Sequence, residues 1–469
     1  MSSSVQNPEA KFHQDSAAKA FDTVHRRKIK FNIGKYNAAV LRGREQYANY
    51  ELARSRAAYF KDQAVRNLDR LLLQWEEKFT ARGGKVIWAR DSKEALEAII
   101  KILEKKHAKL VVKSKSMTTE EIHLNAYLEK NGITPVETDL GEWIVQLAGQ
   151  RPYHIVTPAM HMSKEDVNEL FVKKLQTEST NDPQELTKTA RRLLREKYTT
   201  ADVGISGANF LIADTGAVAL TENEGNARLS VTFPKVHIAI AGIEKIIPEM
   251  EMLDTFWPLL ATAGTGQTVT IYNTLLNGPR RPEETDGPEE MYVVLLDNGR
   301  SKLLADQEKR EALRCIRCGA CLNACPVYKN IGGHSYETTY SGPIGSVISP
   351  HYNGLEQFKH LSFASSLCGA CTSVCPVRID LANLLLQNRR QAVNQGLTTA
   401  AERTGFKLWK TAMKRRKLID MVPAFAKSYA LNSLFKDSWG RRRADIHIAP
   451  KSFHALWEKR RGKSGSDKA

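Results

Sequence analysis

The sequence predicts an α/β domain with a parallel sheet, followed by a helical domain built around cysteines, with helical extensions at both ends. Two observations indicate this class. From Gly83 onward, short apolar runs alternate with helical patterns, which favours β-α-β units and a parallel sheet. In addition, all seven cysteines lie between Cys315 and Cys375. A chain of 469 residues has room for about three domains.

The first segment, residues 1–80, is expected to be a helical arm that packs on the rest of the chain and carries no chemistry. Its apolar residues recur at helical spacing with charged residues between them. They are Tyr59, Ala64, Leu68, Leu71, Leu72 and Trp75.

The α/β domain is expected over residues 81–300. The first half has predicted strands at Lys85–Ala89, Leu110–Lys113 and Ile133–Glu137 and predicted helices at 92–106 and 118–130. Thr118 and Glu121 fit a capping box at the start of the second helix. A helical insertion follows, with helices at 163–176 and 185–196. The second half has apolar strand-like runs at 202–213, 216–220, 236–241 and 291–297.

Several features of this domain are candidate ligand-binding sites. Lys113-Ser-Lys-Ser116 lies at the carboxyl end of a predicted strand, where ligands of parallel sheets bind, although a solvated basic turn is the simpler interpretation. The turn Glu222–Arg228 could hold a small anion or acyl group, or be a hydrogen-bonded structural turn, and both stay open. Gly264-Thr-Gly266 lacks the third glycine of a dinucleotide fingerprint. His154 and His161 are expected to be structural rather than metal ligands.

The cysteines of residues 301–390 form two related frames. The first reads Cys315-x2-Cys318-x2-Cys321-x3-Cys325-Pro, which is the spacing of a ferredoxin-type [4Fe–4S] site. The second has Cys368, Cys371 and Cys375-Pro in the same frame, with Ser365 in place of its first cysteine. Zinc prefers four ligands in paired knuckles, and an odd number of clustered cysteines disfavours disulfides.

In two-cluster ferredoxins the fourth cysteine of each frame binds the other cluster. This rule gives one full set, Cys315, Cys318, Cys321 and Cys375, and one set of three thiolates, Cys325, Cys368 and Cys371. The second cluster would then complete its coordination with water, Ser365 or a ligand from elsewhere, and could convert to a [3Fe–4S] form. Gly319 and Gly369 are expected where the backbone passes close to inorganic sulfide. Between the frames, a glycine-rich segment predicts a long loop with short helices.

The C-terminal region, residues 391–469, is expected to be helical and basic. Residues 401–469 hold 18 Lys and Arg but 6 Asp and Glu. Such a charge favours anionic partners, either an acidic subunit or a membrane surface. Apolar residues alternate with Lys and Arg as in a basic amphipathic surface helix: Phe406, Trp409, Met413, Leu418 and Met421. Nucleic-acid binding is not expected, because no aromatic platform of a known module is present.

Localisation is expected to be cytoplasmic, with peripheral membrane association through the basic tail as an option. The first ten residues are polar and carry no apolar signal segment. Thiolates reserved for iron also fit a reducing compartment.

Taken together, these motifs resemble lactate utilization protein B, the iron–sulfur subunit of a three-part L-lactate oxidation system. The resemblance extends over nearly the whole chain and is carried by Cys315–Tyr328, Ile331–Tyr336, Gly342–Gly345, Ser365–Val377, Asn223–Asn226, Gly287–Glu290 and Asp297–Ser301. It implies an α/β fold similar to CoA transferases and sugar-phosphate isomerases. It also implies an all-α dicluster ferredoxin-type domain with two [4Fe–4S] clusters, the second held by three cysteines.

The implied role is electron transport during oxidation of L-lactate to pyruvate. The implied partners are a cysteine-rich redox subunit and a small α/β subunit. The sequence contains no flavin fingerprint and no spare cysteine, so we expect an electron-transfer subunit rather than a complete enzyme. The alternatives are an electron-transfer subunit of another 2-hydroxy-acid oxidase, of the glycolate type, and an α/β-domain enzyme acting on an acyl-CoA or sugar phosphate.

Overall fold

The computed structural model describes residues 7–415, 421–434 and 443–466. The chain up to Ala392 forms one compact unit, and Val393–Ala469 forms a second. Leu418, one of the predicted apolar positions of the tail, lies outside the described residues.

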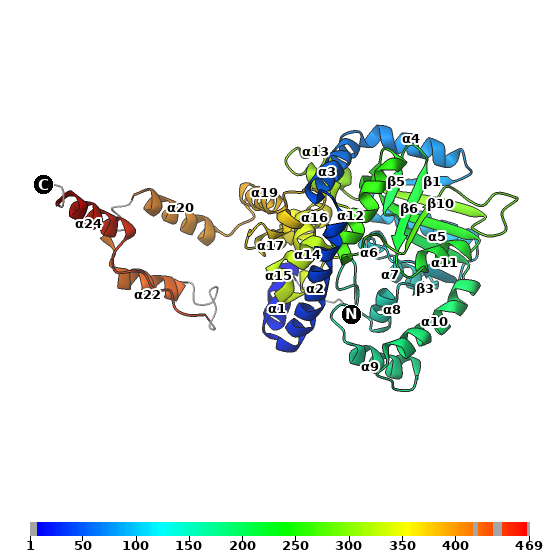
Figure 1. The fold of residues 1–469 in the computed structure, drawn as a ribbon, viewed down its shortest axis with the longest axis horizontal. Coiled ribbons are helices and arrows are strands. Elements are labelled where there is room, and N and C mark those ends of the chain that lie inside the picture. The colour runs from blue at the N-terminus through cyan, green and yellow to red at the C-terminus, as the bar shows by residue number, and fades with distance from the viewer. Residues whose placement is uncertain (1–6, 416–420, 435–442, 467–469) are drawn as a thin grey trace. The chain divides into compact units, whose positions relative to one another are not determined.

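The predicted N-terminal arm is helical and lies on both domains. It consists of α1 (Pro8–Phe21), α2 (Thr23–Gly43), α3 (Tyr50–Arg66) and α4 (Leu68–Thr80). Figure 1 shows α1 and α2 beside α15 (Pro326–Ile331) of the cysteine region, and α4 beside the sheets. Trp75 of α4 is fully buried, and its indole N–H donates to the carbonyl of Ala217 at 3.0 Å.

The predicted parallel sheet is present. Six parallel strands are arranged in the order β1-β10-β7-β4-β2-β3. Their bounds are β1 Lys85–Ala89, β2 Leu110–Lys113, β3 Thr134–Glu137, β4 Val203–Gly207, β7 Val236–Gly242 and β10 Glu290–Leu296. The two most central strands, β7 and β4, are buried along their whole length, as expected for a sheet covered on both faces.

A second, smaller sheet was not predicted. It has the order β8-β5-β6-β9, with β5 Phe210–Ile212, β6 Ala217–Glu222, β8 Ile246–Ile247 and β9 Tyr272–Leu276. The apolar run 202–213 therefore is not one strand: β4 ends at Gly207 and the chain enters the other sheet at Phe210. Because both pieces are buried, their sequence shows no change in polarity at the crossing.

The helices of the α/β domain are α5 Ser92–Lys105, α6 Met117–Glu121, α7 Leu124–Lys130, α8 Leu140–Leu147, α9 Lys164–Leu175, α10 Pro183–Thr200, α11 Asn226–Thr232 and α12 Leu253–Thr265. The four predicted helices are present, one of them split in two, together with α8, α11 and α12, which were not predicted from the sequence. The single helix predicted over 118–130 is split, because His123 has a left-handed φ of 54°. The predicted capping box is wrong: Ser116 caps α6, and its hydroxyl accepts the N–H of Thr119.

The cysteine region contains α13 Arg300–Ala305, α14 Ala320–Ala324, α15, α16 Gly342–Asn353, α17 Leu355–Phe363, α18 Ala370–Val374 and α19 Leu381–Asn394. The helices predicted between the cysteine frames are present, but the long loop is not, since α15, α16 and α17 occupy most of that segment. Its glycines serve close packing instead: a Cβ on Gly345 would lie 1.9 Å from the carbonyl oxygen of Tyr340.

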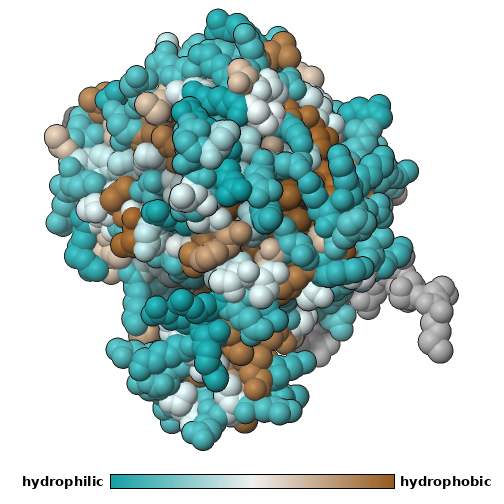
Figure 2. All heavy atoms as spheres, turned by 90° about the vertical axis from the view of Figure 1, so that its right-hand side faces the viewer, coloured by the Kyte–Doolittle hydropathy of each residue, from teal (hydrophilic) through white to brown (hydrophobic). Residues whose placement is uncertain are grey.

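In the C-terminal unit, the structure describes α20 Ala400–Lys414, α22 Ala424–Leu434 and α24 Phe453–Ser466. The predicted apolar residues Phe406, Trp409 and Met413 are all exposed on α20. Among the described residues, no helix combines the length and apolar character needed to cross a membrane. The face drawn in Figure 2 is largely hydrophilic, with its hydrophobic residues in separate patches.

The close approach of α11 to β4 predicts a sharp difference between two glycine substitutions. A Cβ on Gly204 of β4 would lie 1.8 Å from the carbonyl oxygen of Ser230, whereas one on Gly34 of α2 would meet nothing within 4 Å. We expect Gly204→Ala to destabilise the fold by about 1–3 kcal/mol or more through overpacking. Gly34→Ala should be neutral or stabilising by roughly 0.5–1 kcal/mol. Urea unfolding followed by circular dichroism measures both, and equal midpoints for the two variants would contradict the packing described.

Candidate iron–sulfur sites and the adjoining cavity

The two cysteine frames share one backbone conformation. Arg317 and Leu367, each directly before a cysteine, have left-handed φ values of 61° and 53°, and Gly319 and Gly369 both have φ of 78°. Helices α14 and α18 follow at equivalent positions and pack on each other. A Cβ on Gly369 would meet nothing within 4 Å. At Gly369 the left-handed turn alone favours glycine, whereas at Gly319 a Cβ would also lie 3.0 Å from the ring of His154.

The loops bring the cysteines together in two mixed groups. Cys315, Cys318 and Cys321 line one small cavity with Cys375 from the other frame. Burial raises the pKa of Cys375 to about 11, with the charge of Cys315 adding to the rise. Burial likewise raises the pKa of Cys371 to about 11, helped by the neighbouring charges of Cys325 and Cys368. Each group therefore takes cysteines from both frames.

The surroundings of the sulfurs suit thiolate ligands of iron. Backbone N–H groups donate to sulfur at three positions: Arg317 to Cys315 at 3.4 Å, Tyr328 to Cys325 at 3.5 Å and Ile379 to Cys375 at 3.4 Å. Such bonds stabilise a thiolate and tune iron–sulfur sites. Among the described residues, no three His, Cys, Asp or Glu converge as ligands of one metal ion. A cubane does not need this, because each of its thiolates binds a different iron.

The two groups differ in exposure. Cys318, Cys321 and Cys375 are buried, whereas Cys368 is exposed. Ser365, at the position of the missing cysteine, has its hydroxyl engaged in a local turn, where it accepts the N–H of Leu367 at 3.2 Å. We call the Cys315 group the inner site and the Cys368 group the outer site.

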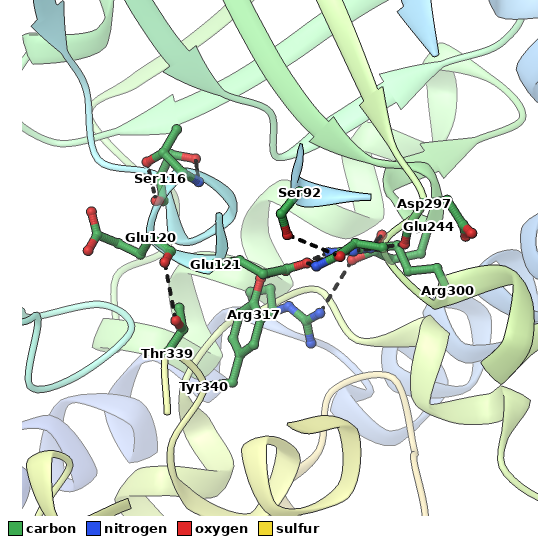
Figure 3. A network of polar contacts seen from close by, with 12 residues as sticks. Ser92, Ser116, Glu120, Glu121, Glu244, Asp297, Arg300, Arg317, Thr339 and Tyr340 are labelled. Atoms are coloured by element: carbon green, nitrogen blue, oxygen red, sulfur yellow. Dashed lines mark hydrogen bonds and ion pairs between the residues drawn. The ribbon is translucent and has the colours of Figure 1, made fainter. Parts of the chain in front are cut away.

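A buried network of charges joins the inner site to the sheet (Figure 3). Arg300, at the start of α13, is fully buried and forms ion pairs with Glu121 of α6 at 2.8 Å and with Glu244, just after β7, at 2.5 Å. Arg317 of the first cysteine loop lies 3.3 Å from the other oxygen of Glu244. Burial alone would raise the pKa of Glu244, but Arg300 and Arg317 lower it to about 2.

Tyr340, which lies in the segment between the cysteine frames, contacts both Glu121 and Arg317 of the network. Its hydroxyl donates to Glu121 at 2.7 Å, and its ring lies 4.5 Å from the guanidinium carbon of Arg317. The network thus connects three separate parts of the chain at the carboxyl edge of the sheet.

A cavity of about 340 Å³ lies at this edge, between the sheet and the first cysteine loop. Its walls come from the ends of β2, β3, β4, β6 and β7, from α12 and from the cysteine region. Polar residues that line it include Lys115, Ser116, Asp139, Asn209, Glu222, Glu224, Lys245 and Arg317, and Cys318 lines it as well. The cavity therefore borders the inner site.

The basic turn Lys113–Ser116, interpreted from the sequence as a solvated turn with an anion site as the alternative, has two different parts. Lys113 is fully buried, with its ammonium 2.7 Å from Glu137 and 2.8 Å from the hydroxyl of Thr119. Burial alone would lower the pKa of Lys113, but Glu137 raises it above its usual range. Lys113 is therefore structural. Lys115 lines the cavity and donates to the carbonyl of Val156 at 2.5 Å.

The Glu222–Arg228 turn also has two parts. Glu222 accepts the N–H groups of Ala227 and Arg228 at 2.6 and 2.9 Å, which makes it a structural anchor of α11. Glu224 accepts the N–H of Leu140 at 2.9 Å. Burial of its carboxyl and the charge of Asp139 raise the pKa of Glu224 to about 7. Both glutamates line the cavity.

The remaining candidates are packing features. A Cβ on Gly266 would lie 2.2 Å from the backbone of Ala39 in α2, and one on Gly264 would lie 3.0 Å from the carbonyl oxygen of Cys318. His154 is buried, its Nδ1 accepts backbone N–H groups, and burial lowers its pKa. His161 stacks on Tyr153 at 4.7 Å between ring centroids. Both histidines thus make packing contacts in the folded chain.

Sequence reasoning missed the charged residues of the network and the cavity: Glu121, Glu244, Lys245, Arg300 and Arg317. A weak signal exists for Glu244-Lys245, a charged pair that directly follows the apolar run of β7. The N-terminal arm also contributes: Arg54 of α3 is buried, and its guanidinium donates to the carbonyls of Ser373 and Cys375 at 2.8 Å each.

These features define a class of protein in which a parallel α/β domain carries a dicluster iron–sulfur domain at the carboxyl edge of its sheet. Comparison with known proteins agrees. Residues 72–296 match the family described as LUD domain, and residues 311–379 match the 4Fe-4S dicluster domain.

More specifically, the chain belongs to the lactate utilization protein B family. It is 46% identical to Lactate utilization protein B of Bacillus cytotoxicus, covering 79% of this chain and 78% of that protein. It is also 44% identical to the uncharacterized electron transport protein YkgF of Escherichia coli, covering 83% of this chain and 82% of that protein. A crystal structure of a duf162 family protein from Deinococcus radiodurans aligns with 49% of this chain at a TM-score of 0.29 and 15% identity.

The buried network predicts a large loss of stability in Arg300→Met. This change leaves the carboxylates of Glu121 and Glu244 buried without their main partner, which typically costs about 3–5 kcal/mol. The matched control is Arg90→Met, because Arg90 pairs with Glu94 at the surface and its side chain is 88% exposed. We expect the control to leave the thermal midpoint nearly unchanged. Similar midpoints for Arg300→Met and wild type would contradict the central role of Arg300.

Proposed function

We propose that this chain is an electron-transfer subunit that works in the oxidation of L-lactate to pyruvate and carries two [4Fe–4S] clusters. The observation that carries the proposal is the pair of mixed cysteine groups, one buried beside the sheet and one reaching the surface. The electron-transport and lactate-utilization names of its relatives support the role.

In this proposal the inner cluster is held by Cys315, Cys318, Cys321 and Cys375, and the outer cluster by Cys325, Cys368 and Cys371. The clusters, when bound, take up and release single electrons. The chain supplies the thiolates and the N–H groups that donate to sulfur. Arg54 fixes the carbonyl of Cys375 from the N-terminal arm, which holds the second loop beside the first.

The same proposal gives the two cysteine sites different neighbours, and so gives electron transfer a path from one end of the cysteine region to the other. The inner site borders the cavity at the sheet edge, and the outer site has an exposed cysteine that a partner subunit can approach. We assign residues 301–390 to an all-α dicluster ferredoxin-type domain, and residues 81–300 to a fold of the CoA-transferase and sugar-phosphate-isomerase type. The arm, 1–80, and the basic tail, 391–469, flank these domains.

For partners, we propose a cysteine-rich redox subunit and a small α/β subunit, in the cytoplasm. The exposed aromatic residues and positive charge of α20 would serve contact with an acidic subunit or a membrane surface. Purification of a tagged chain from cells grown on lactate tests this point, and recovery of the chain without companion subunits would contradict it.

Anaerobic purification tests the proposed cofactors. We expect a brown protein with about eight iron and eight sulfide per chain, and a cluster signal in paramagnetic resonance after reduction. Cys321→Ser should remove the inner cluster and Cys371→Ser the outer one, so the two variants should lose different signals. A colourless protein with stoichiometric zinc would overturn the proposal.

The three-thiolate outer site predicts selective sensitivity to oxygen. An iron without a cysteine is more easily lost, so brief air exposure should give a three-iron resonance signal from the outer site before the inner cluster is damaged. Ser365→Cys should suppress this conversion if residue 365 faces the open iron, and Ser365→Ala should have little effect if water is the ligand. Absence of the signal in wild type, or an equal signal in Ser365→Cys, would contradict our assignment of Ser365 to that corner.

A further inference from the structure

The cavity at the sheet edge contains positive charge that the fold itself does not use. Lys245 is 8% exposed and lines the cavity. The two oxygens of its neighbour Glu244 are bound by Arg300 and Arg317, and Lys245 has no hydrogen bond or ion pair with any described residue. The charge of the neighbouring Glu244 acts on Lys245, but a buried ammonium that donates no hydrogen bond is still costly, which points to an anion that binds there.

Arg317 presents a second free donor to the same space. Its side chain is 8% exposed, and one nitrogen lies near Glu244. Its other terminal nitrogen, Nη1, is buried without a hydrogen-bond partner. Arg317 lies between Cys315 and Cys318 in the sequence and has a left-handed backbone conformation. Its guanidinium packs on the ring of Tyr340. The donor is therefore rigidly held at the wall that the cavity shares with the inner site.

Carboxylates in the lining of the cavity limit the charge of the ligand. Asp139, Glu222 and Glu224 all line the cavity. Lys115 lies 3.9 Å from Asp139, and its charge also acts on Glu224, so this lysine is engaged by the carboxylates. A dianion such as phosphate would face these carboxylates, whereas a single carboxylate fits the ammonium of Lys245 and the unpaired Nη1 of Arg317. The acidic wall also offers acceptors for a hydroxyl group.

We propose that this cavity binds a small organic monocarboxylate, with its carboxylate on Lys245 and Arg317 Nη1, next to the inner iron–sulfur site. The choice of L-lactate and pyruvate as ligands rests on the proposed function, which itself assigns electron transfer to the cysteines and no ligand to the sheet. It gives the α/β domain a binding role of its own.

A competing explanation is that Lys245 only balances the negative charge of the inner site. Lys61 separates the two explanations. It is equally buried, at 1% exposure, but its ammonium donates to the carbonyls of Glu244 and Ile246, and it is absent from the cavity wall. A role in charge balance would make Lys61 and Lys245 equivalent, whereas a role in ligand binding would not.

Calorimetric titration of the anaerobically purified full chain tests the site, with pyruvate, L-lactate and inorganic phosphate as probes at matched ionic strength. We expect saturable binding of at least one of the two monocarboxylates. Lys245→Gln should weaken it by about tenfold or more through loss of a charge-assisted hydrogen bond, and Arg317→Lys should weaken it in the same direction. Lys61→Met should bind as wild type does.

Iron and sulfide content is measured for every variant, so a failure of cluster assembly is distinguished from a failure of binding. If Lys61→Met does not fold, protection of Lys245 from reductive methylation by the bound monocarboxylate, read by mass spectrometry in wild type, replaces that control. Three results would overturn the proposal: no binding of either monocarboxylate, phosphate binding at equal or higher affinity, or equal affinity in Lys245→Gln and wild type.

Discussion

The fully buried guanidinium of Arg300 is the interaction on which the arrangement of the two domains depends. It draws Glu121 of α6 and Glu244 after β7 to one point at the carboxyl edge of the sheet. The second oxygen of Glu244 then receives Arg317 from the cysteine loop, and Glu121 receives the hydroxyl of Tyr340. A charge buried this deeply tolerates little displacement. The same contacts that stabilise the sheet edge therefore also fix the position of the inner cysteine group.

Two loops with nearly the same backbone have acquired different surroundings. The first is packed between the sheet edge and the helices of the N-terminal arm, and its cysteines are buried or half-buried. The second contributes Cys375 to the buried group but leaves Cys368 in contact with solvent. Exposure and nearby charge are among the main determinants of the potential of an iron–sulfur site. The repeat in sequence thus does not imply two equivalent sites.

Sequence reasoning predicted the parts that have a local signal. The six parallel strands follow apolar runs, and the cysteine frames are readable from spacing. The second sheet was missed because β5 continues the apolar run of β4 and because β8 has two residues. Between the frames the sequence predicts too much loop, because glycine normally favours loops, whereas Gly342 and Gly345 allow α16 to pack closely on its neighbours. The charged network could not be predicted, because Glu121, Glu244, Arg300 and Arg317 meet only in the folded chain.

The N-terminal arm has a consequence for the biosynthesis of the protein. Phe12, Ile29 and Ile33 are buried in one core with Tyr328, Tyr336 and Leu361 of the cysteine region. The ribosome synthesises the arm first. These apolar side chains therefore cannot be buried in this core until residues some three hundred positions further along the chain have been synthesised. The cysteine loops, in turn, gain the support of Arg54 only when the arm docks on them. The second cysteine loop therefore reaches its final surroundings only after the arm and the cysteine region have both been synthesised and have packed together.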